Sequence, residues 1–474
     1  MCVPVSPGSG SISARQEPFR RELFQDETRG VGPNAHRERE HQDFPGISDI
    51  NLRSSQGHGE EAHESRVRHG ESPLARERAS KRLHDPLDHN GEYGMRNMNR
   101  SLLTAAAIVT AVTLQAPRIA TAQRLDGSEG PAVFVMTNNA DRNEVVAYSR
   151  TEIGTLLNPV HFLTGGRGSG GTVDPLASQG SLQLSGDKAW LLAANAGSGT
   201  LSLFRVDGSR LEFSDQVSTE GSEPNSVTEH DGLVYVLNAA GTSSVVGFQL
   251  HGGKLTRIPG SLRFLKENNG AFPGSVAFSH DGHFVAVTEK ATNLIDVFRV
   301  LPDGTLSSIK ANASAGPGAF AVGFAPNGAA IVSETGSAAP NSSAISSYSV
   351  NPDGSLTPIS VSVPTLGNAN CWNAVTPDGR FVYASNAGSS TIAGFAIGTG
   401  GTLSALPGTV LALNPSGSAN LDITISADGK FLYSLNAATG AIGMFAIQSN
   451  GTLTNLGTTG GLPASAGFNG IAAD

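Results

Sequence analysis

One unit of about 50 residues recurs seven times in the C-terminal three quarters of the chain, and this repeat restricts the fold more than any other feature. The clearest copy runs from Asn373 to Leu406. Short segments rich in β-branched and aromatic residues alternate in it with turns rich in Gly, Asn, Asp and Pro, a pattern typical of short strands joined by tight turns. Each unit is therefore expected to form four strands.

Three columns of residues align the copies. The first column is a leucine in a hairpin, with spacings of 44 to 55 residues: Leu156, Leu211, Leu255, Leu306, Leu356, Leu403 and Leu453. The second is an aromatic residue seven or eight positions earlier: Tyr148, Phe204, Phe248, Phe298, Tyr348, Phe395 and Phe445. The third is an Asn or Glu before the aromatic: Asn139, Asn195, Asn238, Glu289, Glu334, Asn386 and Asn436. One twisted sheet cannot bury both of its faces alone, so repeats of this length predict an all-β, seven-bladed propeller with four-stranded blades over residues 130–474.

The two ends of the repeat region predict how the ring closes. Residues 132–137 begin the first unit with no inner strand before them, whereas residues 466–474 resemble an inner strand that lacks the rest of its unit. We expect this C-terminal strand to complete the N-terminal blade, because closure removes the open sheet edges.

The front of the chain differs in composition from the repeats. Residues 1–94 are rich in Arg, Glu and His with few aliphatic residues, so they are expected to be disordered or to precede the true start of the protein. Residues 95–122 combine a basic start, an apolar run from Leu102 to Leu114 and small residues at the end, as in a secretory signal peptide. We therefore expect a secreted or periplasmic protein that begins at Gln123.

The charge of the mature chain limits its partners. The 352 residues from Gln123 onward carry 16 basic and 25 acidic side chains, an excess that disfavours nucleic acid and anionic lipid. No segment of this part is expected to span a membrane, and no cofactor motif or metal-ligand spacing is present. The expected partner is a small lactone or sugar-like molecule, and the expected state is a monomer.

The repeat resembles that of the seven-bladed lactonase-type propellers, a family that includes bacterial 6-phosphogluconolactonases and fungal carboxymuconate cyclases. The similarity rests on the seven copies of strand, Asp-Gly turn, strand, Asn-Ala-Gly turn, aromatic strand and Gly-Thr-Leu hairpin. It implies a lactonase or cyclase that uses an Arg-His pair on an inner strand and a Glu after the next strand. Glu289 corresponds to that Glu, but no inner strand of the repeats has Arg or His at the matching positions.

Glu289 and Glu334 replace Asn in two successive blades and are the expected catalytic residues. As a pair at the mouth of the axial channel they could act as acid and base, or bind a cation or sugar hydroxyl groups. Alternatively, each carboxylate caps its own turn.

Five residues near the starts of the inner strands are expected to line the channel and bind the ligand: Trp372, Asn373, Asp422, Asn225 and Ser275. Trp372 offers an aromatic platform for a sugar or another ring, or it fills the channel as a plug. The ligand is expected on the face that carries the loops between the second and third strands.

Two functions are compatible with these observations. The first is an exported lactonase-like enzyme that opens or closes a lactone of a carbohydrate or aromatic-derived acid in the axial funnel. The second is a non-catalytic propeller that binds a glycan, a small molecule or a protein. The missing Arg-His pair favours the second, and the whole-length resemblance favours the first.

Overall fold

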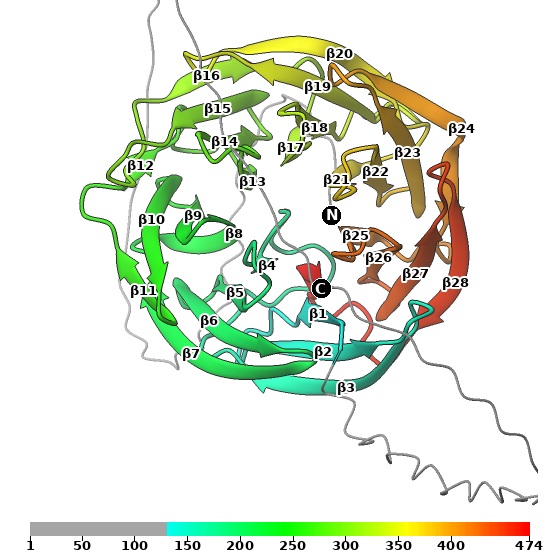
Figure 1. Ribbon diagram of the computed structural model, residues 1–474, viewed down its shortest axis with the longest axis horizontal. Coiled ribbons are helices and arrows are strands. Elements are labelled where there is room, and N and C mark those ends of the chain that lie inside the picture. The colour runs from blue at the N-terminus through cyan, green and yellow to red at the C-terminus, as the bar shows by residue number, and fades with distance from the viewer. Residues whose placement is uncertain (1–129) are drawn as a thin grey trace, which may run out of the picture. The chain divides into compact units, whose positions relative to one another are not determined.

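The computed structural model describes residues 130–474, in which it has 29 strands and no helix. The segments expected to be disordered and to form a signal peptide, residues 1–94 and 95–122, lie outside the described residues. Seven antiparallel sheets surround a central axis (Figure 1). The strand that comes first in the chain lies innermost in six of them, and the C-terminal strand lies innermost in the seventh. The expected seven-bladed β-propeller is confirmed.

Blades 1 to 3 come first along the chain. Blade 1 contains β29 (Ile471–Ala473), β1 (Ala132–Met136), β2 (Glu144–Arg150) and β3 (Leu156–Leu163). Blade 2 contains β4 (Leu182–Leu184), β5 (Trp190–Asn195), β6 (Thr200–Asp207) and β7 (Arg210–Ser218). Blade 3 contains β8 (Ser222–His230), β9 (Leu233–Ala240), β10 (Ser244–His251), β11 (Lys254–Arg257) and the short β12 (Arg263–Phe264), which also pairs with β10.

Blades 4 to 7 repeat the four-stranded plan. Blade 4 contains β13 (Pro273–Phe278), β14 (Phe284–Glu289), β15 (Leu294–Arg299) and β16 (Lys310–Ala313). Blade 5 contains β17 (Ala319–Phe324), β18 (Ala330–Glu334), β19 (Ala344–Val350) and β20 (Leu356–Pro364). Blade 6 contains β21 (Asn370–Val375), β22 (Phe381–Asn386), β23 (Thr391–Ile397) and β24 (Leu403–Leu413). Blade 7 contains β25 (Asn420–Ile425), β26 (Phe431–Asn436), β27 (Ala441–Ile447) and β28 (Leu453–Thr459).

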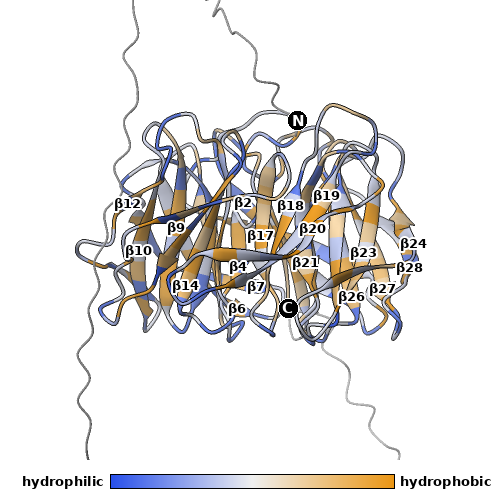
Figure 2. Cartoon of the chain, turned by 90° about the horizontal axis from the view of Figure 1, so that it is seen from above, coloured by the Kyte–Doolittle hydropathy of each residue, from blue (hydrophilic) through white to orange (hydrophobic). Residues whose placement is uncertain are grey.

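The core lies between neighbouring blades. Every member of the aromatic column is at most 2% exposed, so this column packs the blades together. Between blades 1 and 7, for example, Val133 and Val135 share a buried cluster with Tyr433 and Leu435. Apolar residues are concentrated in the strands and polar residues in the loops at the two faces of the ring (Figure 2).

The turn between the first two strands of a blade repeats one hydrogen-bonded arrangement. In blade 4 the Ser279 hydroxyl donates to Asp281 Oδ1 at 2.6 Å and accepts from the Phe284 amide at 2.9 Å. Gly282 follows at a φ of 71°, a backbone conformation that glycine adopts without steric cost. Asp-Gly pairs therefore mark the turns before the second strands of blades 3, 4, 6 and 7.

The ring closes through the C-terminal strand. β29 pairs antiparallel with β1, with Ala473 opposite Val133 and Ile471 opposite Val135. The side chain of Ile471 joins the buried cluster between blades 1 and 7. The expected completion of the first blade by the C-terminus is confirmed.

Candidate functional site in the axial channel

The connection between β3 and β4 crosses the centre of the ring instead of following its rim (Figure 1). We call residues 172–181 the crossing segment. Its hydrogen bonds reach several blades: the Gln179 amide donates to Gly274 O of blade 4 at 2.9 Å, and Gln179 O accepts from the Ser226 hydroxyl of blade 3 at 2.6 Å. The Thr172 carbonyl accepts from the Gly467 amide at 2.7 Å. The segment therefore fills one end of the channel.

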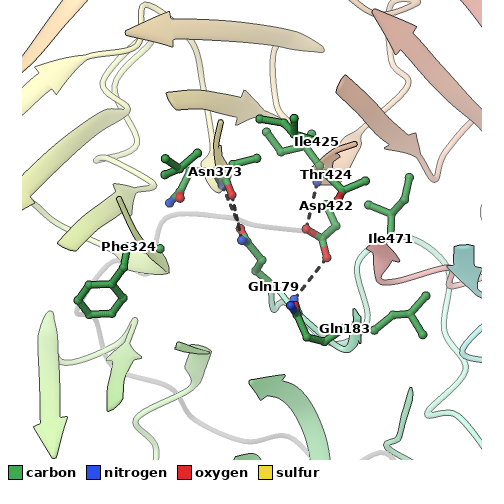
Figure 3. A pocket seen from close by; sticks show the side chains of 14 residues that line it. Gln179, Gln183, Phe324, Asn373, Asp422, Thr424, Ile425 and Ile471 are labelled. Atoms are coloured by element: carbon green, nitrogen blue, oxygen red, sulfur yellow. Dashed lines mark hydrogen bonds between the residues drawn. The ribbon is translucent and has the colours of Figure 1, made fainter. Parts of the chain in front are cut away.

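The side chain of Gln179 is paired with the backbone of blade 6. Gln179 Oε1 accepts from the Asn373 amide and Gln179 Nε2 donates to the Asn373 carbonyl, both at 2.9 Å (Figure 3). The backbone carbonyl of Ser178, the residue before Gln179, accepts a hydrogen bond from Trp372 Nε1 at 2.8 Å. These bonds hold the crossing segment against β21.

Two connected cavities remain in the channel. The axial cavity has a volume of about 270 Å³ and is lined by the inner strands of blades 1, 2, 5, 6 and 7 together with the crossing segment. The vestibule has a volume of about 610 Å³ and is lined mainly by blades 3, 4, 5 and 6. Both cavities are lined by Gln179, Gly180, Gln183, Gly323, Phe324 and Val375. The vestibule extends to turns between first and second strands, where Lys188, His280 and Pro377 lie.

Asp422 is the acidic residue of the axial cavity (Figure 3). Its Oδ1 accepts from the Ile423 amide at 3.0 Å and its Oδ2 from the Gly180 amide at 3.4 Å. Burial raises the pKa of Asp422 to about 7; the nearby Asp174 contributes to this rise, and the backbone hydrogen bonds oppose it. A carboxyl group with a pKa near neutrality is suited to accept and return a proton.

Asp174 of the crossing segment interacts electrostatically with Lys290 of blade 4. Burial raises the pKa of Asp174, and Lys290 and the Asn469 amide oppose this rise. Lys290 Nζ donates to the Ala177 carbonyl and lies 4.7 Å from the centroid of the Phe320 ring. Burial lowers the pKa of Lys290 to about 8, while Asp174 and Glu223 oppose the change. This lysine lines neither the axial cavity nor the vestibule.

The structure brings some of the expected ligand-binding residues to the cavities. Asn373 and Asp422 line the axial cavity, and Ser275 lines the vestibule. Asn225 instead donates to the Pro273 carbonyl at 3.0 Å and lines neither cavity. Trp372 has no exposed surface and lines neither cavity; its ring centroid lies 5.1 Å from that of Phe320.

Glu289 and Glu334 are each completely buried at the end of a second strand. Glu289 accepts from the Glu267 amide at 3.0 Å and from the Thr292 hydroxyl at 2.6 Å. Glu334 accepts from the hydroxyls of Ser346 at 2.6 Å and Ser362 at 2.7 Å. Neither residue lines the axial cavity or the vestibule, and their catalytic role stays a prediction.

Gln179, Gln183 and Phe324 line both cavities but are not among the residues that the sequence pattern predicts at the channel. Gln179 and Gln183 lie in or next to the crossing segment, and Phe324 ends the inner strand of blade 5. The sequence does contain one indication of Gln179 and Gln183. The longest spacing between hairpin leucines, from Leu156 to Leu211, contains the crossing segment. A long connection inside a compact repeat is frequently functional.

Residues 130–474 contain no group of three or more His, Cys, Asp or Glu side chains arranged to hold a metal ion. In the same part of the chain no helix has the length and apolar character needed to cross a membrane.

The fold and the axial cavities define a seven-bladed propeller with a polar central channel. Solved structures share this fold: a candidate 6-phosphogluconolactonase from Bacteroides fragilis (18% identity, 74% of this chain and 99% of that chain, TM-score 0.54) and a periplasmic gluconolactonase from Pseudomonas aeruginosa (18% identity, 71% and 98%, TM-score 0.53). A third, from Bacteroides uniformis, is also described as a candidate 6-phosphogluconolactonase (19% identity, 72% and 100%, TM-score 0.53). No protein-family model and no curated protein matches the sequence.

Proposed function

We propose that the protein is a lactonase-like hydrolase that opens an uncharged sugar lactone in the axial cavity, with Asp422 as the general base. The observation that carries this proposal is a carboxyl group with a pKa of about 7 on the wall of a cavity. The likeness in fold to proteins named as lactonases supports the reaction class.

The reaction needs one proton to be moved twice. The Asp422 carboxylate removes a proton from water as the water oxygen attacks the lactone carbonyl carbon. The ring C–O bond then breaks, and the proton passes from the Asp422 carboxyl group to the departing alkoxide. The Gln183 amide, which lines the same cavity, is the proposed donor to the oxygen that becomes negative.

The charges of the axial cavity favour a neutral substrate. Among the residues that line it, Asp422 is the only charged side chain, and no Lys, Arg or His is present. A phosphate or carboxylate on the substrate would have no bidentate partner there and would be repelled by Asp422. We therefore propose a sugar lactone without an anionic group.

Replacement of the general base tests the proposal. Asp422→Asn should lower kcat for glucono-δ-lactone by about 100- to 10,000-fold, the usual contribution of a positioned base. Asp207→Asn, at an exposed position of blade 2, is the matched control and should keep the wild-type rate. An unchanged rate in Asp422→Asn would contradict the assignment of Asp422.

A second candidate function is non-catalytic binding of a sugar-like ligand. The observation that favours it is the lack of any imidazole or ammonium group on the wall of the axial cavity. Calorimetric binding of an uncharged sugar, together with no hydrolysis of glucono-δ-lactone, δ-valerolactone or muconolactone, would establish this function in place of the first.

We also propose that the protein is exported through the segment at residues 95–122. The basic start, the apolar run and the small residues before Gln123 support this, and one structure of the same fold is named as a periplasmic protein. Sequencing the N-terminus of exported material should give Gln123 as the first residue. A mature protein that retains residues 1–94 would contradict the proposal.

A further inference from the structure

The vestibule is larger than the axial cavity and continuous with it. Its volume of about 610 Å³ lies within the range of about 300–1,000 Å³ of small-molecule sites, whereas the axial cavity, at about 270 Å³, lies just below that range. The crossing segment fills the channel on the other side of Gln179. A ligand bound at Asp422 therefore has room to extend in the direction of the vestibule.

The wall of the vestibule combines the ring of Phe324 with hydrogen-bonding groups. Phe324, which lies across the axial cavity from Asp422, lines both compartments (Figure 3). Phe278 also lines the vestibule, but its side chain is only 8% exposed and its ring packs against that of Tyr235, with ring centroids 5.3 Å apart. Ser275 lies on the same wall.

The charges of the vestibule are nearly balanced. Lys188 and Glu229 contribute one charge of each sign, and both Glu229 oxygens accept from backbone amides, those of Gly186 and Gly232, at 2.7 Å. The imidazole groups of His230 and His280 lie on the same wall. An aromatic ring next to hydroxyl and amide groups suits a sugar, because a sugar has an apolar face and many hydroxyl groups.

We propose that the vestibule is a second sugar subsite, so that the substrate is an uncharged disaccharide lactone. The lactone ring lies against Asp422 in the axial cavity, and the second sugar unit lies in the vestibule and stacks on Phe324. This inference rests on the proposed function for its reaction, but the subsite itself is defined by the vestibule and can be tested by binding alone.

The test compares one and two sugar units. The wild-type protein is assayed for hydrolysis of glucono-δ-lactone, cellobiono-δ-lactone and maltobiono-δ-lactone, and KM is determined for each lactone. We expect KM to be about tenfold lower for at least one disaccharide lactone, which corresponds to about 1.4 kcal/mol. Equal KM values for all three lactones would overturn the subsite while leaving the hydrolase assignment in place.

Variants of Phe324 locate the effect. Phe324→Ala removes the ring, and Phe324→Leu keeps apolar volume without a flat face, which guards against a loss caused by unfolding alone. Both should reduce the tenfold difference in KM to less than about threefold. Phe264→Ala is the matched control, because Phe264 is an exposed ring on the short outer strand β12, and the difference should persist in it. Persistence of the difference in both Phe324 variants would overturn the stacking role.

Failure of the proposed function is distinguishable from failure of the subsite. If no lactone is hydrolysed, calorimetry with D-glucose and D-cellobiose or D-maltose decides. A disaccharide that binds about tenfold more tightly than glucose, and loses this advantage in Phe324→Leu, supports the subsite without the reaction. Equal binding, or no binding of any of these sugars, overturns the subsite as well.

Discussion

Asp422 and Asp296 both have a raised pKa, but they are placed differently in the molecule. Asp422, although only 2% exposed, lies on the wall of the axial cavity. Asp296 has no exposed surface, and this burial raises its pKa. The neighbouring Glu289 raises the pKa as well, whereas the Lys266 amide opposes the rise by donating a hydrogen bond of 2.8 Å to Asp296. The environment of Asp422 therefore suits proton transfer, whereas that of Asp296 affects the stability of blade 4.

Asp296 is expected to make the protein less stable as the pH rises from 5 to 8. Because the folded pKa is raised, the folded state holds a proton that the unfolded state has lost above about pH 4, so stability falls until the pH passes the folded pKa. Between pH 5 and pH 8, the free energy of unfolding should fall by about 1–3 kcal/mol less in Asp296→Asn than in the wild type, at 1.36 kcal/mol per pKa unit. The asparagine side chain can still accept a hydrogen bond from the Lys266 amide and can donate one to Glu289.

Urea unfolding at pH 5 and at pH 8 provides the measurement. Asp207→Asn is the control, since its side chain is exposed, and it should keep the wild-type difference between the two pH values. If the free energy of unfolding of Asp296→Asn changes between pH 5 and pH 8 by as much as that of the wild type, the Asp296 carboxyl group does not contribute to the pH dependence.

The crossing segment is the element that distinguishes this channel from an open one. Its residues hydrogen-bond to the inner strands of blades 3, 4, 6 and 7. Its last residues bring the Gly180 amide to Asp422 and the Gln179 side chain to Asn373. Because it contacts opposite sides of the ring, it both closes one end of the channel and positions the wall of the axial cavity.

Loss of the Gln179 side chain should weaken this arrangement. Gln179→Ala removes two hydrogen bonds of 2.9 Å and leaves the Asn373 amide and carbonyl unpaired, which should cost about 1–3 kcal/mol of unfolding free energy. Activity should fall as well, because the neighbouring Gly180, whose amide donates to Asp422, is then less firmly positioned. Gln249→Ala, at an exposed glutamine that donates to Gly232 O at 3.0 Å, should change stability by less than about 0.5 kcal/mol. Equal stabilities of the two variants would contradict the bridging role.

The ring as a whole depends on β29. Without this strand β1 has an unpaired edge facing the channel, and the cluster between blades 1 and 7 loses Phe468 and Ile471. Closure therefore links residues that are more than 330 positions apart in the chain.

Deletion of residues 466–474 should lower the free energy of unfolding by more than about 3 kcal/mol, since truncating one buried large apolar residue alone costs about 2–5 kcal/mol. Ile471→Asp should have a similar effect in the full-length chain. Thr454→Asp, at an exposed position of β28, should stay within about 0.5 kcal/mol of wild type. Equal unfolding midpoints for the truncated and full-length proteins would contradict closure by β29.

The repeat, the number of blades and the closing strand could all be predicted from the amino-acid sequence. These features could be predicted because they depend on local physics: alternating apolar positions form strands, Asp-Gly pairs form turns, and the aromatic column marks the surface between blades. All seven aromatic residues of that column are buried as expected.

The sequence also placed Asn373, Asp422 and Ser275 at the channel, because the starts of inner strands converge on the axis in any propeller. It did not place Gln179, Gln183 and Phe324 there. Which polar groups line the cavities depends on the path of the crossing segment, and this path is held by hydrogen bonds to several blades at once. No local pattern encodes such contacts, whose partners lie as far apart as Gln179 and Asn373.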